Sequence, residues 1–223
     1  MSFLDLNNEE EQQQRNYGPV PSGSLVLCRI TIEKPQYSDQ GNSFISRSQH
    51  GMLGLWAKIE VVAGTYAGVY WYDNIWLPIS QQKVPLNDGQ QTACRMGGAR
   101  IKAVVEACRG ISPKDDSAKA KRDRNIEILD LNGMEFPARL GISNKPGKSK
   151  DGRMFWNNIV GAVITPDKSE YKEIRNGGER ITDGPVVGKE SANQTQTQPS
   201  QNGYDDPGYD APPASAYDDS VPF

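Results

Sequence analysis

The stretch MLGLWAKIEVV-AGTYAG-VYWYDNIWL (residues 52–77, followed by Pro78) contains two runs of alternating side chains on either side of a glycine-bounded turn. Alternation with a period of two is typical of β-strands that bury one face. In the first run the buried face is predicted to carry Leu53, Leu55, Ala57, Ile59 and Val61. The second run ends at Pro78, because proline has no N–H to donate to a strand ladder. The stretch therefore predicts two consecutive strands.

Further elements are predicted on both sides of this stretch. Upstream, SLVLCRITIE (24–33) alternates in the same way, and the polar segment 35–51 that follows it is predicted to be a loop. Downstream, a helix over about 97–109 is predicted, with Gly110 as its C-terminal stop. Its apolar positions recur at helical spacing: Ile101, Val104, Val105 and Cys108.

The remaining body adds strands after the helix. NIEILDL-NG-MEFPARLGI (125–142) is predicted to form two strands joined by an Asn-Gly turn, and MFWNNIVGAVI (154–164) a last strand. The order is then three strands, a helix, one or two strands and a final strand. This order predicts an all-β fold class with one helix, the OB-fold, in which a five-stranded Greek-key barrel binds oligonucleotides on strands 2 and 3 and in two flanking loops. Other small barrels with one helix share the order.

The composition predicts three regions. Residues 1–20 are polar and predicted to be flexible, 21–175 form the body, and 176–223 form an acidic tail predicted to be disordered. The tail is rich in Gly, Pro, Gln, Asn, Ser and Asp and cannot bury enough apolar surface to offset its ordering entropy. Charge is divided unevenly, at +6 over 17–180 and −6 over 181–223. A basic body suggests a polyanionic partner.

Several functional classes are disfavoured by the sequence. The cysteines Cys28, Cys94 and Cys108 form no C-x-x-C pair, and His50 is the single histidine, so neither a metal site nor a cofactor is expected. No recognised catalytic motif occurs, which argues against an enzyme. There is no signal-peptide pattern and no apolar run near the ~20 residues that span a bilayer, so we expect a cytoplasmic protein without membrane contact.

Aromatic residues gather on the polar face of the two central strands. If Trp71 and Ile75 point inward, the outward face carries these candidate DNA-binding residues: Trp56, Lys58, Tyr70, Tyr72 and Trp76. Nucleic-acid bases stack on such rings with about 1–3 kcal/mol per base and little sequence preference. The alternative is the opposite register, or a patch covered by a loop or by another subunit of a homo-oligomer.

A basic loop precedes the last strand. It supplies further candidate DNA-binding residues, namely Lys145, Lys148, Lys150 and Arg153, followed by Trp156. In the OB reading this loop joins strands 4 and 5, one of the two loops that grip an oligonucleotide. The alternative is an ordinary solvated loop.

The last six residues, DDSVPF, form a distinct motif. Asp218, Asp219, Val221, Pro222 and Phe223 resemble the C-terminal tip of bacterial single-stranded DNA-binding proteins, while Ser220 departs from its usual acidic character. The resemblance implies that the tip docks replication, recombination and repair enzymes. A pocket with a basic residue can capture both the ring and a carboxylate.

The body shows a second resemblance. Residues 132–171 together with GTYAG are similar to a family of phage-encoded proteins found with recombination and replication genes. Together the resemblances imply a phage-encoded protein that binds and protects single-stranded DNA in the bacterial host cell and recruits partner enzymes. Two alternatives remain: a tail-mimicking adaptor or inhibitor of the host partners without DNA affinity, and a recombination nuclease.

Overall fold

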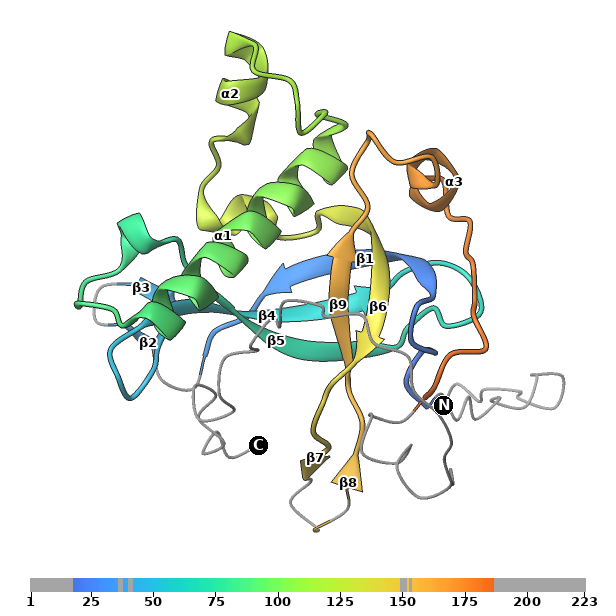
Figure 1. The fold of residues 1–223 in the computed structure, drawn as a ribbon, viewed down its shortest axis with the longest axis horizontal. Helices are drawn as coiled ribbons and strands as arrows, with labels where there is room; N and C mark the ends of the chain where they lie inside the picture. The colour runs from blue at the N-terminus through green and yellow to red at the C-terminus, as the bar shows by residue number, and fades with distance from the viewer. Residues whose placement is uncertain (1–17, 36–37, 40–41, 149–151, 153, 187–223) are drawn as a thin grey trace, which may run out of the picture.

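The computed structural model describes residues 18–35, 38–39, 42–148, 152 and 154–186. The fold is mostly antiparallel β-sheet with few helices (Figure 1). The strands are β1 Leu25–Ile32, β2 Ser38–Asp39, β3 Asn42–Arg47, β4 Leu53–Val61, β5 Tyr70–Trp76, β6 Glu135–Ile142, β7 Gly147–Lys148, β8 Met154–Phe155 and β9 Asn158–Val163. The helices are α1 Asp88–Arg109, α2 Ala118–Arg124 and α3 Tyr171–Arg175, with 3-10 turns η1 Ile79–Gln81 and η2 Ile128–Leu131.

Strand β1 organises the main sheet. Its first half pairs with β6 and its second half with β4, both antiparallel. The sheet order is β2-β3-β4-β1-β6-β9, and β5 pairs with the other edge of β4. The short strands β7 and β8 form a separate hairpin that extends beyond β6 and β9 (Figure 1).

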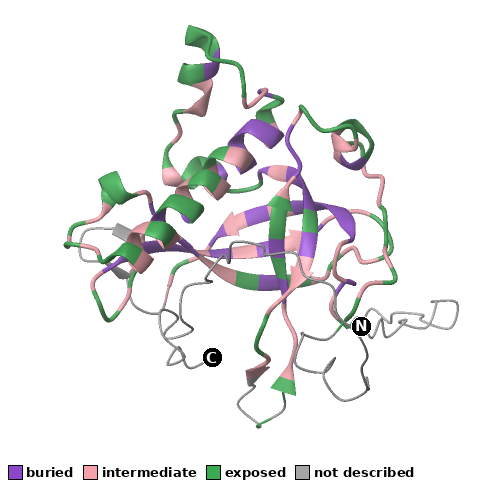
Figure 2. Cartoon of the chain, viewed as in Figure 1, coloured by how far each residue is buried: buried purple, intermediate pink, exposed green. Residues whose placement is uncertain are grey.

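The buried residues of the strands form a main hydrophobic core, and Leu25, Ile164 and Ile174 form a smaller second cluster. Figure 2 colours the chain by burial. The alternation predicted for 52–62 is confirmed, because its five predicted inward residues are all buried. Trp71 and Ile75 of β5 are buried as well, at 3% exposure each. Strand β1 departs from simple alternation, since Leu25 and Leu27 are also buried.

Helix α1 begins nine residues before the predicted start at 97. Asn87 caps it, and the Asn87 and Gln90 side chains form a capping box with each other's backbone N–H groups. Gly110 ends the helix in the left-handed conformation, as predicted. The earlier start was missed because the regular apolar spacing used for the prediction begins only at Ile101, and Gly97 and Gly98 have low helix propensity. Packing outweighs propensity here, since Gly97 lies against the backbone of Trp76.

The prediction of a strand at 125–131 was wrong. Residues 128–131 form the turn η2, which places Leu131 in the core. The Asn-Gly pair that follows does not join a hairpin. Instead Asn132 Oδ1 accepts a hydrogen bond of 2.6 Å from Ile32 N, and Gly133 N donates to Ile30 O at 2.9 Å. The turn residues therefore attach η2 to the end of β1.

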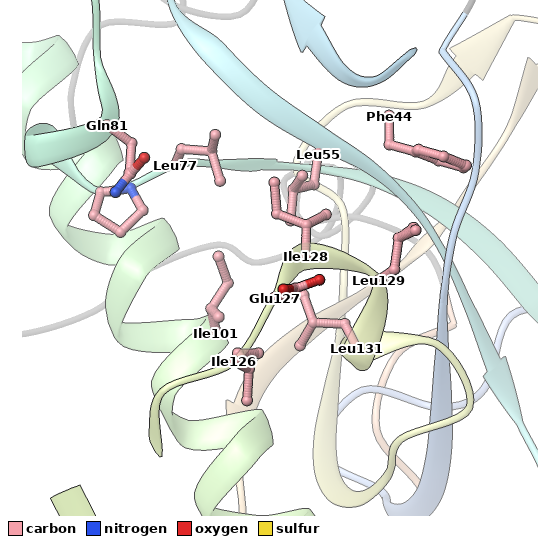
Figure 3. A pocket seen from close by; sticks show the side chains of 11 residues that line it. Phe44, Leu55, Leu77, Gln81, Ile101, Ile126, Glu127, Ile128, Leu129 and Leu131 are labelled. Carbon is pink, nitrogen blue, oxygen red and sulfur yellow. The ribbon is translucent and has the colours of Figure 1, made fainter. Parts of the chain in front are cut away.

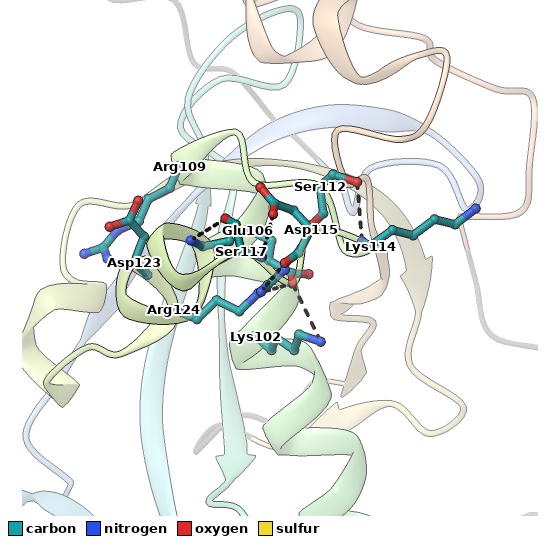
Figure 4. Close-up of polar contacts among 10 residues, drawn as sticks. Lys102, Glu106, Arg109, Ser112, Lys114, Asp115, Ser117, Asp123 and Arg124 are labelled. Carbon is teal, nitrogen blue, oxygen red and sulfur yellow. Dashed lines mark hydrogen bonds and ion pairs between the residues drawn. The ribbon is translucent and has the colours of Figure 1, made fainter.

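The prediction of an all-β fold with a single helix also needs correction, because the described residues contain three α-helices. Helix α2 lies in the charged segment between α1 and η2, and an ion-pair network fixes it to α1 (Figure 4). The buried Glu106 carboxylate accepts from Arg124 Nε at 2.7 Å, and Lys102 Nζ lies 3.7 Å away. Arg124 also donates to the carbonyls of Asp115 and Ser112. The loop expected at 35–51 likewise contains β2 and β3.

Both expected boundaries of the body shift outward. Val20 is buried, and its backbone exchanges two hydrogen bonds of 2.8 Å with the Asn158 side chain. At the other end, Arg180 bridges to Leu25 through backbone hydrogen bonds in both directions. Val20 and the segment from Arg180 to Pro185 are therefore bonded to the body rather than belonging to the flanking segments.

Candidate nucleic-acid interface

Strands β4 and β5 position the predicted aromatic residues. Their register places Lys58 opposite Tyr72, Trp56 opposite Asn74, and Gly54 opposite Trp76. Cross-strand partners point to the same side of a sheet. Tyr70 and Tyr72 are exposed, at 55% and 40%, whereas Trp71 between them is buried. The outward placement expected for these rings therefore agrees with the register and the exposure. We call Trp56, Lys58, Tyr70, Tyr72 and Trp76 the aromatic face.

The rings of this face contact one another. Trp56 and Tyr72 are stacked in parallel, with centroids 5.5 Å apart and planes 3° from parallel. Tyr70 meets Tyr72 edge-on at 6.0 Å. Lys58 Nζ lies 4.5 Å from the Tyr70 ring centroid, which is within cation–π range. The contacts preorganise four of the five side chains.

Trp76 lies farther along the same face, and a glycine gives it room. A Cβ added at Gly54 would lie 3.0 Å from the Trp76 ring and 2.6 Å from Asn74 Oδ1. The side chain of Ser46 borders this spot and donates to Gly54 O at 3.0 Å. Gly54 thus lets the Trp76 ring lie across β4, which extends the aromatic surface toward β3.

The charge on this face is balanced in part. Lys58 Nζ is 3.2 Å from Glu60 Oε2, so the one cation among the candidate residues of this face already has a carboxylate partner. Glu60 was not among the predicted site residues. Its place on the polar side of the alternating run was the signal that could have indicated it.

Helix α1 is fixed beneath the aromatic face. Asp73 points to the opposite side of β5 from its neighbours Tyr72 and Asn74, and its Oδ2 lies 2.5 Å from Arg100 NH1. Burial raises the pKa of the Asp73 carboxyl, and the Arg100 guanidinium lowers it in part. The Arg100–Asp73 ion pair therefore joins α1 to β5 next to Tyr72.

Only part of the basic loop belongs to the described residues. Lys145 is exposed and Trp156 is half-buried at the two ends of the β7–β8 hairpin. Among the described residues, no ion pair or ring contact links these two side chains to the aromatic face. Lys150 and Arg153 lie outside the described residues, as does the side chain of Lys148. The tip residues Asp218, Asp219, Val221, Pro222 and Phe223 lie outside them too.

A concavity lies between α1, η2 and the sheet, away from the residues of the aromatic face (Figure 3). It has a volume of about 490 Å³ and is lined mainly by apolar side chains, with Gln81 and Glu127 as its polar members. Ligand sites usually combine such a lining with several convergent polar groups. This groove lacks a nucleophile or a charged pair, so its chemistry is that of an apolar contact surface.

The described part of the chain contains no group of three or more His, Cys, Asp or Glu residues able to hold a metal ion. Within the same part, every helix is too short or too polar to cross a bilayer. A scan of protein-family models gave no match to the chain, and a search of curated proteins gave none either.

Proposed function

We propose that the chain binds and protects single-stranded DNA with little sequence preference, in phage DNA replication, recombination and repair. The aromatic face carries this proposal. Exposed rings that are already ordered offer stacking surface to any base, because every base has a π face. An exposed patch of this kind also needs a partner in a soluble protein.

The proposal includes an OB-fold for the body. Its support is the pairing pattern: β1 is shared between β4 and β6, β5 follows β4, and β9 follows β6. With α1 between β5 and β6, these five strands correspond to the five of an OB barrel. The aromatic face then falls on strands 2 and 3, the surface on which such barrels bind oligonucleotides.

The ring geometry limits how bases can bind. Inserting a base between Trp56 and Tyr72 requires two contact distances of about 3.5–4.0 Å each, more than their 5.5 Å centroid separation allows. Bases therefore stack on the outer surfaces of the ring group, and on Trp76 beyond it. Only a limited number of bases can therefore stack on the aromatic face at one time.

Titration of the full chain with a single-stranded oligonucleotide, followed by tryptophan fluorescence, tests the proposal. Stacking on Trp56 or Trp76 should quench the emission. Replacing Tyr72 by alanine should weaken binding by about 1–3 kcal/mol. Replacing exposed Met96, which lies on α1, should leave binding unchanged. Unquenched emission together with unchanged anisotropy at low salt would refute the proposal.

The proposal assigns partner recruitment to the tip, on the sequence resemblance alone. Deleting residues 218–223 should leave DNA affinity equal or slightly higher, because an acidic competitor for a basic surface is removed. The same deletion should abolish binding to host enzymes that recognise such tips. If the chain binds those enzymes but no DNA, the tail-mimicking adaptor is the correct reading.

A further inference from the structure

The outward surface next to the aromatic face carries an ordered set of charges. Three strand registers align one row across the sheet, and its members from β5 to β6 are Tyr70, Glu60, Arg29 and Glu135. Arg175 of α3 extends this row, with NH1 3.6 Å from Glu135 Oε2. Lys58, two residues before Glu60 on β4, lies beside the row and pairs with Glu60. We call Lys58, Glu60, Arg29, Glu135 and Arg175 the charged row.

Every charge in the row has a partner, and every one remains accessible. Arg29 NH2 lies 2.6 Å from Glu135 Oε1, in addition to the Lys58–Glu60 pair. The side chains are 26–43% exposed. Accessible ion pairs of this kind contribute only about 0–1 kcal/mol. An incoming phosphate can therefore replace a carboxylate at little cost.

The row also has the right sign and position for a nucleic-acid backbone. It holds three cations and two carboxylates, and it begins at Tyr70, one of the exposed rings. Adjacent strands lie about 4.8 Å apart, so Arg29 is one strand away from Lys58. A strand whose bases stack on Tyr70 and Tyr72 would bring its phosphates to this edge of the face.

We propose that the charged row is the phosphate-binding extension of the aromatic face. Phosphates replace Glu60 as the partner of Lys58, and replace Glu135 as the partner of Arg29 and Arg175. The two carboxylates hold the cations in place before DNA arrives and lower the affinity once it has. This inference rests on the proposed function and adds Arg29, Arg175 and the two glutamates to the site.

Opposite effects from the two members of one ion pair provide the test. Arg29→Gln and Glu135→Gln break the same contact. For each variant of the full chain, the affinity for an oligothymidine is measured over a range of salt concentrations. Arg29→Gln should weaken binding and reduce the slope of log affinity against log salt by about 0.7, the value for one phosphate on a single strand. Glu135→Gln should tighten binding about threefold, the effect of one charge about 6 Å away in water. Glu60→Gln should act in the same direction.

Lys119→Gln and Asp123→Asn are the matched controls, because they break a comparable surface pair on α2, 2.6 Å apart. Both should leave affinity and slope unchanged. If the wild-type chain binds but Arg29→Gln and Arg175→Gln keep its slope, the inference is overturned alone. If Arg29→Gln and Glu135→Gln both weaken binding in proportion to a lowered melting temperature, the pair is structural and the inference also fails. Absence of wild-type binding overturns the proposed function with it.

Discussion

Replacing Gly97 by alanine should destabilise the protein through one added methyl group. Gly97 is buried on α1, where a Cβ would lie 2.0 Å from Trp76 O and 3.0 Å from Trp76 N. Helix and strand would have to separate by about 1 Å, and overpacking of this kind costs about 1–3 kcal/mol. The obstacle is backbone, which places the cost near 3 kcal/mol, offset by about 1 kcal/mol of helix propensity. The net loss is then about 2 kcal/mol.

Thermal unfolding followed by far-ultraviolet circular dichroism measures this loss. For a chain of this size, about 2 kcal/mol lowers Tm by roughly 4–8 °C. Gly98→Ala is the matched control, because its Cβ would meet only the Pro78 ring, at 3.2 Å. That variant gains the same helix propensity without a backbone clash, so it should melt at or up to about 4 °C above the wild type. Equal melting temperatures for the two variants would show that α1 does not contact Trp76 as closely as described.

Three more predictions concern buried polar groups. Burial raises the pKa of the Asp73 carboxyl above its ordinary 3.8, so the folded state binds the carboxyl proton more tightly than the unfolded state does. The free energy of unfolding of the wild type, relative to that of Asp73→Asn, should therefore fall as pH rises through 3.8 toward the folded pKa. Urea unfolding between pH 3 and 7 measures that difference, and a rise instead would contradict the assignment. Arg124→Met should cost about 3–5 kcal/mol because it leaves the buried Glu106 carboxyl without its nearest partner, whereas Lys102→Met should cost under about 1 kcal/mol by the same urea assay. Asn158→Leu should cost about 2–4 kcal/mol and speed amide exchange at Val20, whose N–H loses its acceptor; unchanged exchange would argue against the contact.

The sequence predicted those features that follow from local periodicity. The inward and outward faces of β4 follow directly from alternation. For β5 the sequence left the opposite register open, and the burial of Trp71 and Ile75 decides it, which groups Trp56 with Tyr72. The early start of α1 and the turn η2 could not be predicted in this way. Gly97 weakens a helix locally but is required by the nearby strand, and Asn132 finds its hydrogen-bond partner 100 residues away. Such long-range contacts leave no local periodic signal.

The charged row escaped prediction for the same reason. Arg29, Glu60 and Glu135 each occupy an ordinary polar position in their own strand. Their alignment depends on the pairing of β4, β1 and β6, which are separated in sequence by up to about a hundred residues. Only the registers bring them into one row.

The pairing of Leu25 with Arg180 has a consequence for the ends of the body. Ser22 N also donates to Pro185 O at 3.2 Å, so the polypeptide enters and leaves the folded body at the same corner. The two ends of the folded body therefore lie close to each other. Circular permutation, with a short linker joining residues 18 and 186 and new ends opened in the exposed segment 114–117, should therefore preserve the fold.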